Sequence, residues 1–249
     1  MKRREFLRSA ATAGVALGPV AAGIGPLSAS AGQQPYAARP IVNPDPLIPP
    51  KSGKINVAFA IADGATIIDF CGPWEVFQDV HVHSRGETMD EMMPFRLYTV
   101  AATADPITAS GGMKIMPNYT VANAPEPDVV VVPALSGNKV LHLWLAKVAP
   151  QTDVTMSVCT GAFQLARAGL LDGLVATTHH DFYDHFEDEF PEIELQRGSR
   201  FVENERISTA GGLTSGIDLA LHVVERYFGR DVAQWTADYM EYQSDSWKV

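Results

Sequence analysis

The sequence contains only two cysteines, Cys71 and Cys159, and has no long apolar run beyond its N-terminus. Two cysteines cannot build the disulfide framework of a small secreted domain. A chain of 249 residues with 46% hydrophobic content also buries enough core to fold without one. Without an apolar stretch of about 20 residues there is no internal membrane-spanning helix. We therefore expect a globular protein with two free thiols, a disulfide between them being the alternative.

Basic residues are also scarce. Lysine and arginine together number 19 against 29 aspartates and glutamates, which gives a formal net charge of −10. Residues 1–31 hold four of the basic residues and one acidic residue, so without them the charge is −13. So acidic a protein has no general attraction for nucleic acid or for an anionic membrane. We expect a small-molecule substrate, with no nucleic-acid partner and no membrane partner after loss of residues 1–31.

Residues 1–31 have the pattern of an export signal. Basic residues at 2–4 precede an apolar stretch over 10–24, and Ala29-Ser30-Ala31 forms a small-residue cleavage site. The paired arginines are typical of a twin-arginine leader, which predicts a periplasmic or secreted product. An uncleaved N-terminal anchor is the alternative. Residues 32–53 contain six prolines and indicate an extended linker or arm, so a single domain is predicted over 54–249.

Apolar runs and helical patterns alternate along this domain. Strands are predicted over 55–62, 95–102, 129–133, 154–158 and 175–178, and helices over 73–80, 140–148, 181–190, 215–228 and 231–242. A hairpin is expected over 107–121, a strand pair around Asn204-Glu205, an irregular segment over 81–93, and a capping box from Ser215 to Asp218. The alternation predicts an α/β domain with a mainly parallel sheet.

In such sheets ligands bind beyond the carboxyl ends of the strands. Asp69, the loop 133–137, Cys159 and the loop 178–180 each follow a predicted strand. These four segments should therefore face one crevice.

Cys159 stands at a sharp turn between a predicted strand over 154–158 and an apolar helical pattern that begins near Gly161. The same strand–turn–helix arrangement presents the nucleophile in serine hydrolases. A thiol at a helix N-terminus faces free N–H groups, and these favour the thiolate. The alternative is an inert buried cysteine, which is the commoner case.

Three neighbouring positions are candidates to assist Cys159. Asp69 is a candidate acid/base, or else an ordinary residue at a helix N-terminus. Thr160 is expected either to donate to a developing charge or to cap the helix. His179 or His180 is a candidate partner in a Cys–His pair, or a structural residue. Glu75, inside a predicted helix, is interpreted as structural.

Other site types have weak support. His81-x-His83 and His179-His180-Asp181 offer metal ligands, but neither spacing matches a known site, so no metal is predicted. Residues 210–216, AGGLTSG, open a helix but lack the lysine of a phosphate-binding loop. We interpret this segment as a tight turn that packs a helix on the sheet.

Three segments together resemble the ThiJ/PfpI superfamily, which is related to class I glutamine amidotransferases: IIDFCGPWEVF (67–77), SVCTGAFQLARAGLLDGLVATTH (157–179) and STAGGLTSGIDLAL (208–221). The resemblance covers roughly residues 55–230 and is strongest to the isonitrile hydratase-like branch. It implies a flavodoxin-like three-layer α/β/α sandwich, usually a homodimer, without cofactor or metal. It also implies that Cys159 attacks an isonitrile carbon, Asp69 supplies the proton, Thr160 assists, and water releases an N-substituted formamide.

The sequence departs from the family pattern at two places that bear on the substrate. A glycine pair that often follows the third strand is replaced by Ala134-Leu135-Ser136-Gly137, and the backbone N–H groups of Ala134, Leu135 and Gly137 are expected to bind substrate. A His-Trp pair of many relatives is replaced by His179-His180, and His179 is a further expected substrate-binding residue.

Two other functions of the same fold remain open at this stage. One is a non-catalytic ligand-binding or redox-sensing module, and the other is a glyoxalase-like or amidase-like enzyme. Related regulators carry a C-terminal helix-turn-helix domain. Because this sequence ends at Val249 and begins with an export pattern, we do not expect a transcription factor.

Overall fold

The computed structural model describes residues 45–249. The predicted leader and the first part of the predicted arm, residues 32–44, lie outside the described residues. Residues 45–53 contain no helix or strand. The Leu47 N–H donates to the Arg226 carbonyl at 2.9 Å, and Arg85 donates to the carbonyls of Pro50 and Gly53.

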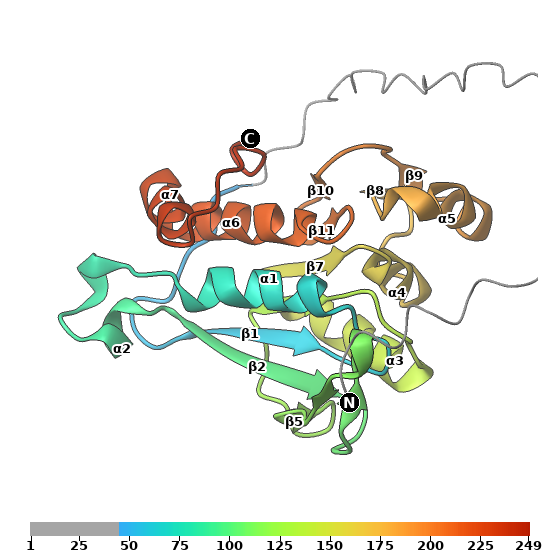
Figure 1. Ribbon diagram of the computed structural model, residues 1–249, viewed down its shortest axis with the longest axis horizontal. Helices are drawn as coiled ribbons and strands as arrows, with labels where there is room; N and C mark the ends of the chain where they lie inside the picture. The colour runs from blue at the N-terminus through green and yellow to red at the C-terminus, as the bar shows by residue number, and fades with distance from the viewer. Residues whose placement is uncertain (1–44) are drawn as a thin grey trace, which may run out of the picture. The chain divides into compact units, whose positions relative to one another are not determined.

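A seven-stranded sheet in the order β10-β11-β7-β6-β1-β2-β5 forms the centre of the domain (Figure 1). Its strand pairs are parallel except for β10 with β11. The strands are β1 (Ile55–Ala60), β2 (Phe95–Ala101), β5 (Tyr119–Thr120), β6 (Val129–Val132), β7 (Val154–Val158), β10 (Phe201–Glu203) and β11 (Ile207–Ala210). Two short pairs lie outside it: β3 (Ile107–Thr108) with β4 (Lys114–Ile115), and β8 (Val175–Ala176) with β9 (Glu194–Leu195).

The helices are α1 (Ile67–Gln78), α2 (Met89–Met92), α3 (Lys139–Val148), α4 (Gly161–Arg167), α5 (Tyr183–Glu189), α6 (Ser215–Phe228) and α7 (Arg230–Tyr239). Alternate residues of β1 face opposite sides of the sheet, as strand geometry requires. Val57 and Phe59 pack in one core with α1, α6 and α7, whereas Ala58 and Ala60 pack in a second core with α3, α4 and α5. The predicted three-layer sandwich with a mainly parallel sheet is confirmed.

The described part of the chain confirms the predicted strands to within two residues, together with the strand pair around Asn204-Glu205. The hairpin predicted over 107–121 forms only over 107–115, because residues 119–120 join the central sheet as β5. None of its helices is both long and apolar enough to cross a membrane. The expectation of two free thiols is also met, with Cys71 exposed and Cys159 buried.

The predicted start of the first helix is wrong. Helix α1 begins at Ile67, so Pro73 lies inside it and Asp69 lies in its first turn. Proline is disfavoured in a helix interior because it lacks the N–H donor. Here α1 packs closely on α6: a Cβ on Gly72 would lie 2.8 Å from Ile217, and one on Gly216 would lie 3.2 Å from Pro73. This tertiary contact stabilises the helix through Pro73.

Two smaller predictions are also wrong. The 81–93 segment is not wholly irregular, because Thr88 and Glu91 form a capping box that starts α2. Conversely, the capping box expected at Ser215 is absent: Thr214 is the N-cap of α6, without a side-chain cap. The buried Asp218 carboxylate instead pairs with the partly exposed Arg200, and this ion pair takes the carboxylate away from the helix end.

Candidate active site

Cys159 occupies the turn between β7 and α4. Its φ of 58° lies in the left-handed region, which is strained for a residue with a side chain. Two hydrogen bonds stabilise this strained conformation. The Cys159 N–H donates to the Gly211 carbonyl at 2.7 Å, and the Thr178 hydroxyl donates to the Cys159 carbonyl at 2.9 Å. Gly161 starts α4 so close to β6 that a Cβ would lie 2.1 Å from the Val132 carbonyl oxygen. The predicted sharp turn is confirmed.

The sulfur of Cys159 is surrounded by one acid and several donors. The Asp69 carboxyl faces it, and the backbone N–H groups of Thr160 and Leu213, with the Thr160 hydroxyl, act on it as donors that favour the thiolate. Thr160 is the N-cap of α4 by position but makes no side-chain cap. Of the two roles predicted for Thr160, the structure supports donation toward the sulfur.

Leu213 is a site residue that the sequence analysis missed. It belongs to the AGGLTSG segment interpreted as a plain tight turn, and its φ of 49° lies in the left-handed region. Its backbone N–H lowers the pKa of the Cys159 thiol, which places this group beside the sulfur. Strain in a non-glycine residue is a recurrent mark of functional sites, but it is visible only in coordinates. The paired glycines ahead of Leu213 were the one available signal.

The electrostatic balance at Cys159 differs from the prediction. The pKa of the Cys159 thiol is raised to about 11, because burial and, after it, the Asp69 charge outweigh the donors from Thr160 and Leu213 that lower it. The donors at the helix N-terminus do favour the thiolate, as expected, but they do not decide the net pKa of Cys159. Desolvation and a neighbouring negative charge outweigh the helix-end donors.

Asp69 is fully buried in the first turn of α1. Its Oδ2 accepts from the Ala134 N–H at 3.1 Å. Its Oδ1 has no partner with hydrogen-bond geometry among the described residues, although the Cys159 thiol interacts with the carboxyl and lowers its pKa. Burial dominates and raises the pKa of Asp69 to about 6. This carboxyl can thus hold or release a proton near neutral pH, beside the thiol.

The loop after β6 lies against α4. The Gln164 amide donates to the Leu135 carbonyl at 3.2 Å, and its Oε1 accepts from His142 Nε2 at 2.8 Å. Gly137 approaches Gln164 so closely that a Cβ would meet Oε1. Ala134, Leu135 and Gly137 are thus held at the carboxyl end of the sheet, with Ala134 touching Asp69. Gln164 is the second residue that the sequence analysis missed, because a buried glutamine within a helix has no motif.

His179 packs on the loop that carries Leu213, since a Cβ on Gly212 would lie 2.4 Å from its ring. Its Nδ1 accepts from the Asp181 N–H at 3.2 Å, and its ring stacks on His180. The pKa of Cys159 reflects no influence of either histidine. Within the described part of the chain, the structure therefore places His179 beside the site but forms no Cys–His pair.

A model of the DJ-1/PfpI family matches residues 55–226. The chain belongs to this family. The family resemblance predicted from the three sequence segments is confirmed. Isonitrile hydratase from Pseudomonas putida is 30% identical over 198 residues, which cover 76% of this chain and 78% of that enzyme.

Other DJ-1/PfpI relatives are regulators. The HTH-type transcriptional regulator GbdR of Pseudomonas aeruginosa is 26% identical over 204 residues, which cover 80% of this chain but 54% of the regulator. This chain therefore spans about half the length of that protein. Among solved structures, a ThiJ/PfpI family protein from Pseudomonas syringae superposes with a TM-score of 0.67 at 26% identity, covering 79% of this chain and 78% of that one. The family thus includes both enzymes and regulators.

Proposed function

We propose that this DJ-1/PfpI protein is a cysteine enzyme that adds water to an isonitrile, or to a similar small electrophile, and releases an N-substituted formamide. The observation that carries the proposal is the pair formed by Cys159 on its strained turn and the buried Asp69 that faces it. Thr160 is the assisting residue. The similarity to isonitrile hydratase supports this choice of substrate class.

In the first step, the Cys159 sulfur forms a bond to the terminal isonitrile carbon. That carbon takes up the thiol proton by way of the Asp69 carboxyl, so a thioimidate, S–CH=N–R, results. A pKa of about 6 suits Asp69 to this transfer, because an acid/base is most effective when its pKa lies near the working pH.

In the second step, water adds to the thioimidate carbon, and the nitrogen gains a proton through Asp69. The carbon–sulfur bond then breaks, the formamide R–NH–CHO leaves, and the sulfur recovers its proton. The donors from Thr160 and Leu213 stabilise the departing thiolate. The net reaction consumes one isonitrile and one water and needs no redox partner. Substrate contacts are assigned to Ala134, Leu135, Gly137 and His179.

The test is steady-state turnover of an alkyl isonitrile, followed by chromatographic detection of the formamide. We expect multiple turnovers in the unmodified protein and none above background in Cys159→Ser or Asp69→Asn. Cys71→Ser is the matched control, because Cys71 is an exposed thiol on α1 and should be dispensable. Formamide production that persists in Cys159→Ser contradicts the proposal.

A second candidate function is a ligand-binding or redox-sensing module. The similarity to GbdR favours it, and the raised pKa of Cys159, which leaves the resting sulfur as a thiol, favours its ligand-binding form over its redox-sensing form. Ligand binding that survives Cys159→Ser, with no turnover of isonitriles, aldehydes or amides, supports this alternative. Turnover of an aldehyde or amide alone indicates instead a glyoxalase-like or amidase-like enzyme.

We further propose export by residues 1–31 and assembly as a homodimer. The export pattern in the sequence supports the first, and the family resemblance supports the second. Detection of a mature N-terminus near residue 32 in the periplasmic fraction tests export. Light scattering of the purified protein at micromolar concentration tests the dimer.

A further inference from the structure

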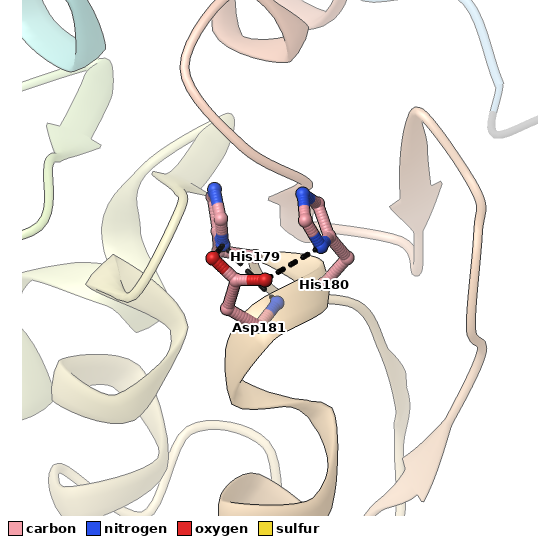
Figure 2. A group of neighbouring side chains, drawn as sticks. All are labelled: His179, His180 and Asp181. Atoms are coloured by element: carbon pink, nitrogen blue, oxygen red, sulfur yellow. Dashed lines mark hydrogen bonds and ion pairs between the residues drawn. The ribbon is translucent and has the colours of Figure 1, made fainter. Parts of the chain in front are cut away.

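Three consecutive side chains bring metal-binding atoms together at the start of the 3-10 helix His180–Phe182. His179, His180 and Asp181 each offer one ligand atom, and these atoms all lie within 4.8 Å of one another. Figure 2 shows the two imidazole rings side by side with the Asp181 carboxylate turned toward both. The Asp181 oxygens lie 3.0 Å from His180 Nδ1 and 3.8 Å from His179 Nδ1.

The donor set is that of a divalent transition metal. Two imidazoles and one carboxylate suit zinc, cobalt or nickel, whereas calcium and magnesium prefer oxygen ligands. Three protein ligands leave positions open for water, as in catalytic rather than structural zinc sites. The three ligand atoms already lie close together, so small side-chain rotations bring them to metal-binding distance. His180 and Asp181 can make these rotations because their side chains are largely exposed.

One of the three ligands is held firmly. The His179 side chain is only 17% exposed, and its ring lies against Gly212 and meets Phe182 edge-on at 5.9 Å between centroids. A site with one fixed ligand and two adaptable ligands loses less side-chain entropy on binding than three free side chains would.

The surrounding charge favours a cation. Residues 181–192 contain six carboxylates, and only some of these are paired: Arg197 contacts Asp184 and Glu187, and Arg167 contacts Glu189. Exposed pairs of this kind neutralise the local field only in part. The segment therefore presents a negative surface next to the three ligands, which raises the local concentration of cations.

We propose that His179, His180 and Asp181 bind a divalent transition-metal ion at the edge of the candidate active site. The position follows from two contacts: Thr178, the residue before the cluster, bonds the Cys159 carbonyl, and His179 packs on Gly212, the residue before Leu213. The sequence analysis predicted no metal because three adjacent ligands match no known spacing. The proposal does not depend on the reaction proposed above, since it is tested by binding alone.

The test is a titration of the full chain with Co²⁺, read by visible absorbance, followed by displacement with Zn²⁺. We expect a saturable signal with one ion per chain. His180→Ala and Asp181→Asn should each weaken binding roughly tenfold or more, since even supporting residues of metal sites contribute this much. Zn²⁺ should also raise the melting temperature of the unmodified protein but not that of His180→Ala.

Two matched controls locate the site. His83→Ala removes an exposed histidine of the His81-x-His83 segment and should leave binding unchanged. Cys159→Ser should also leave it unchanged, and no sulfur-to-cobalt charge-transfer band should appear. Melting curves in chelator establish that the variants are folded. The proposal is overturned if no saturable signal appears, if binding survives in the double variant His180→Ala/Asp181→Asn, or if it is lost in Cys159→Ser.

Discussion

Asp69 is held by the fold in a position that disfavours its charge, and this has a measurable effect on stability. Burial raises the pKa of Asp69 from 3.8 to about 6 in the folded state. Between these values the folded protein keeps a proton that the unfolded chain releases, so the free energy of unfolding falls as the pH rises from about 4 to 6. This loss of unfolding free energy is complete only about one pH unit above the folded-state pKa, and it amounts to about 3 kcal/mol at most.

We therefore expect Asp69→Asn to raise the free energy of unfolding at pH 8 by about 1–3 kcal/mol while it abolishes turnover. The gain should nearly vanish near pH 3.5, where Asp69 is largely protonated in both states. Denaturant unfolding at the two pH values measures it. Glu75→Gln, an exposed carboxyl on the same helix, is the control and should change little. A destabilised Asp69→Asn at pH 8 would show that the charge is favourable in the folded state.

The Asp69 carboxylate also raises the pKa of the neighbouring thiol. After burial, the Asp69 charge is the next largest cause of the raised pKa of Cys159. We expect Asp69→Asn to lower that pKa and to speed alkylation of Cys159 at pH 8, even though turnover is lost. Mass spectrometry of iodoacetamide labelling against pH, in a Cys71→Ser background, measures the change. Slower labelling in Asp69→Asn means that the carboxyl activates the thiol instead.

At the scale of elements, the loop after β6 depends on α4 for its position. Gln164 is 4% exposed and joins the Leu135 carbonyl to His142. We expect Gln164→Ala to reduce the free energy of unfolding by about 1–3 kcal/mol, because buried groups lose their partners. We also expect faster hydrogen exchange over residues 134–138, measured by mass spectrometry. Gln151→Ala, at an exposed position, is the control. Unchanged exchange in Gln164→Ala means that other contacts hold this loop.

The elements that the sequence predicts best are those fixed by local pattern. Val129–Val132 is an unbroken β-branched run and forms a fully buried central strand. The sharp turn at Cys159 is likewise predicted by its local sequence, a strand followed by Cys-Thr-Gly and a helix. Gly161 is needed there because α4 starts so close to β6 that a side chain would not fit. The convergence of Asp69 and Cys159 follows from the rule that parallel strands end at one edge of the sheet.

What the sequence does not predict depends on contacts between distant segments. Helix α1 passes through Pro73 because glycines in α1 and α6 allow the two helices to pack closely. Leu213 joins the site through a backbone N–H, which carries no side-chain signal. The pKa of Cys159 was mispredicted for the same reason: burial and the Asp69 charge come from outside the local motif.

At the scale of the whole described domain, helix α6 contacts both the first described residues, 45–47, and the C-terminal segment around Trp247. The Arg226 carbonyl accepts from the Leu47 N–H, and the Arg226 guanidinium donates to the Asp45 carbonyl. His222, one turn earlier, interacts through Nδ1 with the Trp247 carbonyl at 3.1 Å, and the Trp247 side chain is fully buried. The end of the arm and the C-terminal segment thus both rest on α6.

One buried carboxyl supports these contacts. Glu203 lies 2.7 Å from His222 Nε2 and 3.2 Å from Arg226 Nη1, and its side chain is wholly inaccessible. Removing one member of a buried ionic cluster leaves the others without compensation, which typically costs 3–5 kcal/mol. We expect Glu203→Gln to lower the free energy of unfolding by about 3 kcal/mol.

The effect should reach beyond the substituted residue, because Arg226 and His222 carry the attachments of both segments. Limited proteolysis should cut Glu203→Gln more readily before Lys54 and after Tyr242 than it cuts the unmodified protein. Asp245→Asn is the matched control: Asp245 pairs with Lys248 but is 85% exposed, and exposed pairs contribute under about 1 kcal/mol. If Glu203→Gln is no less stable than Asp245→Asn, the cluster does not hold the two segments, and their attachment must come from the apolar contacts of Leu47 and Trp247 alone.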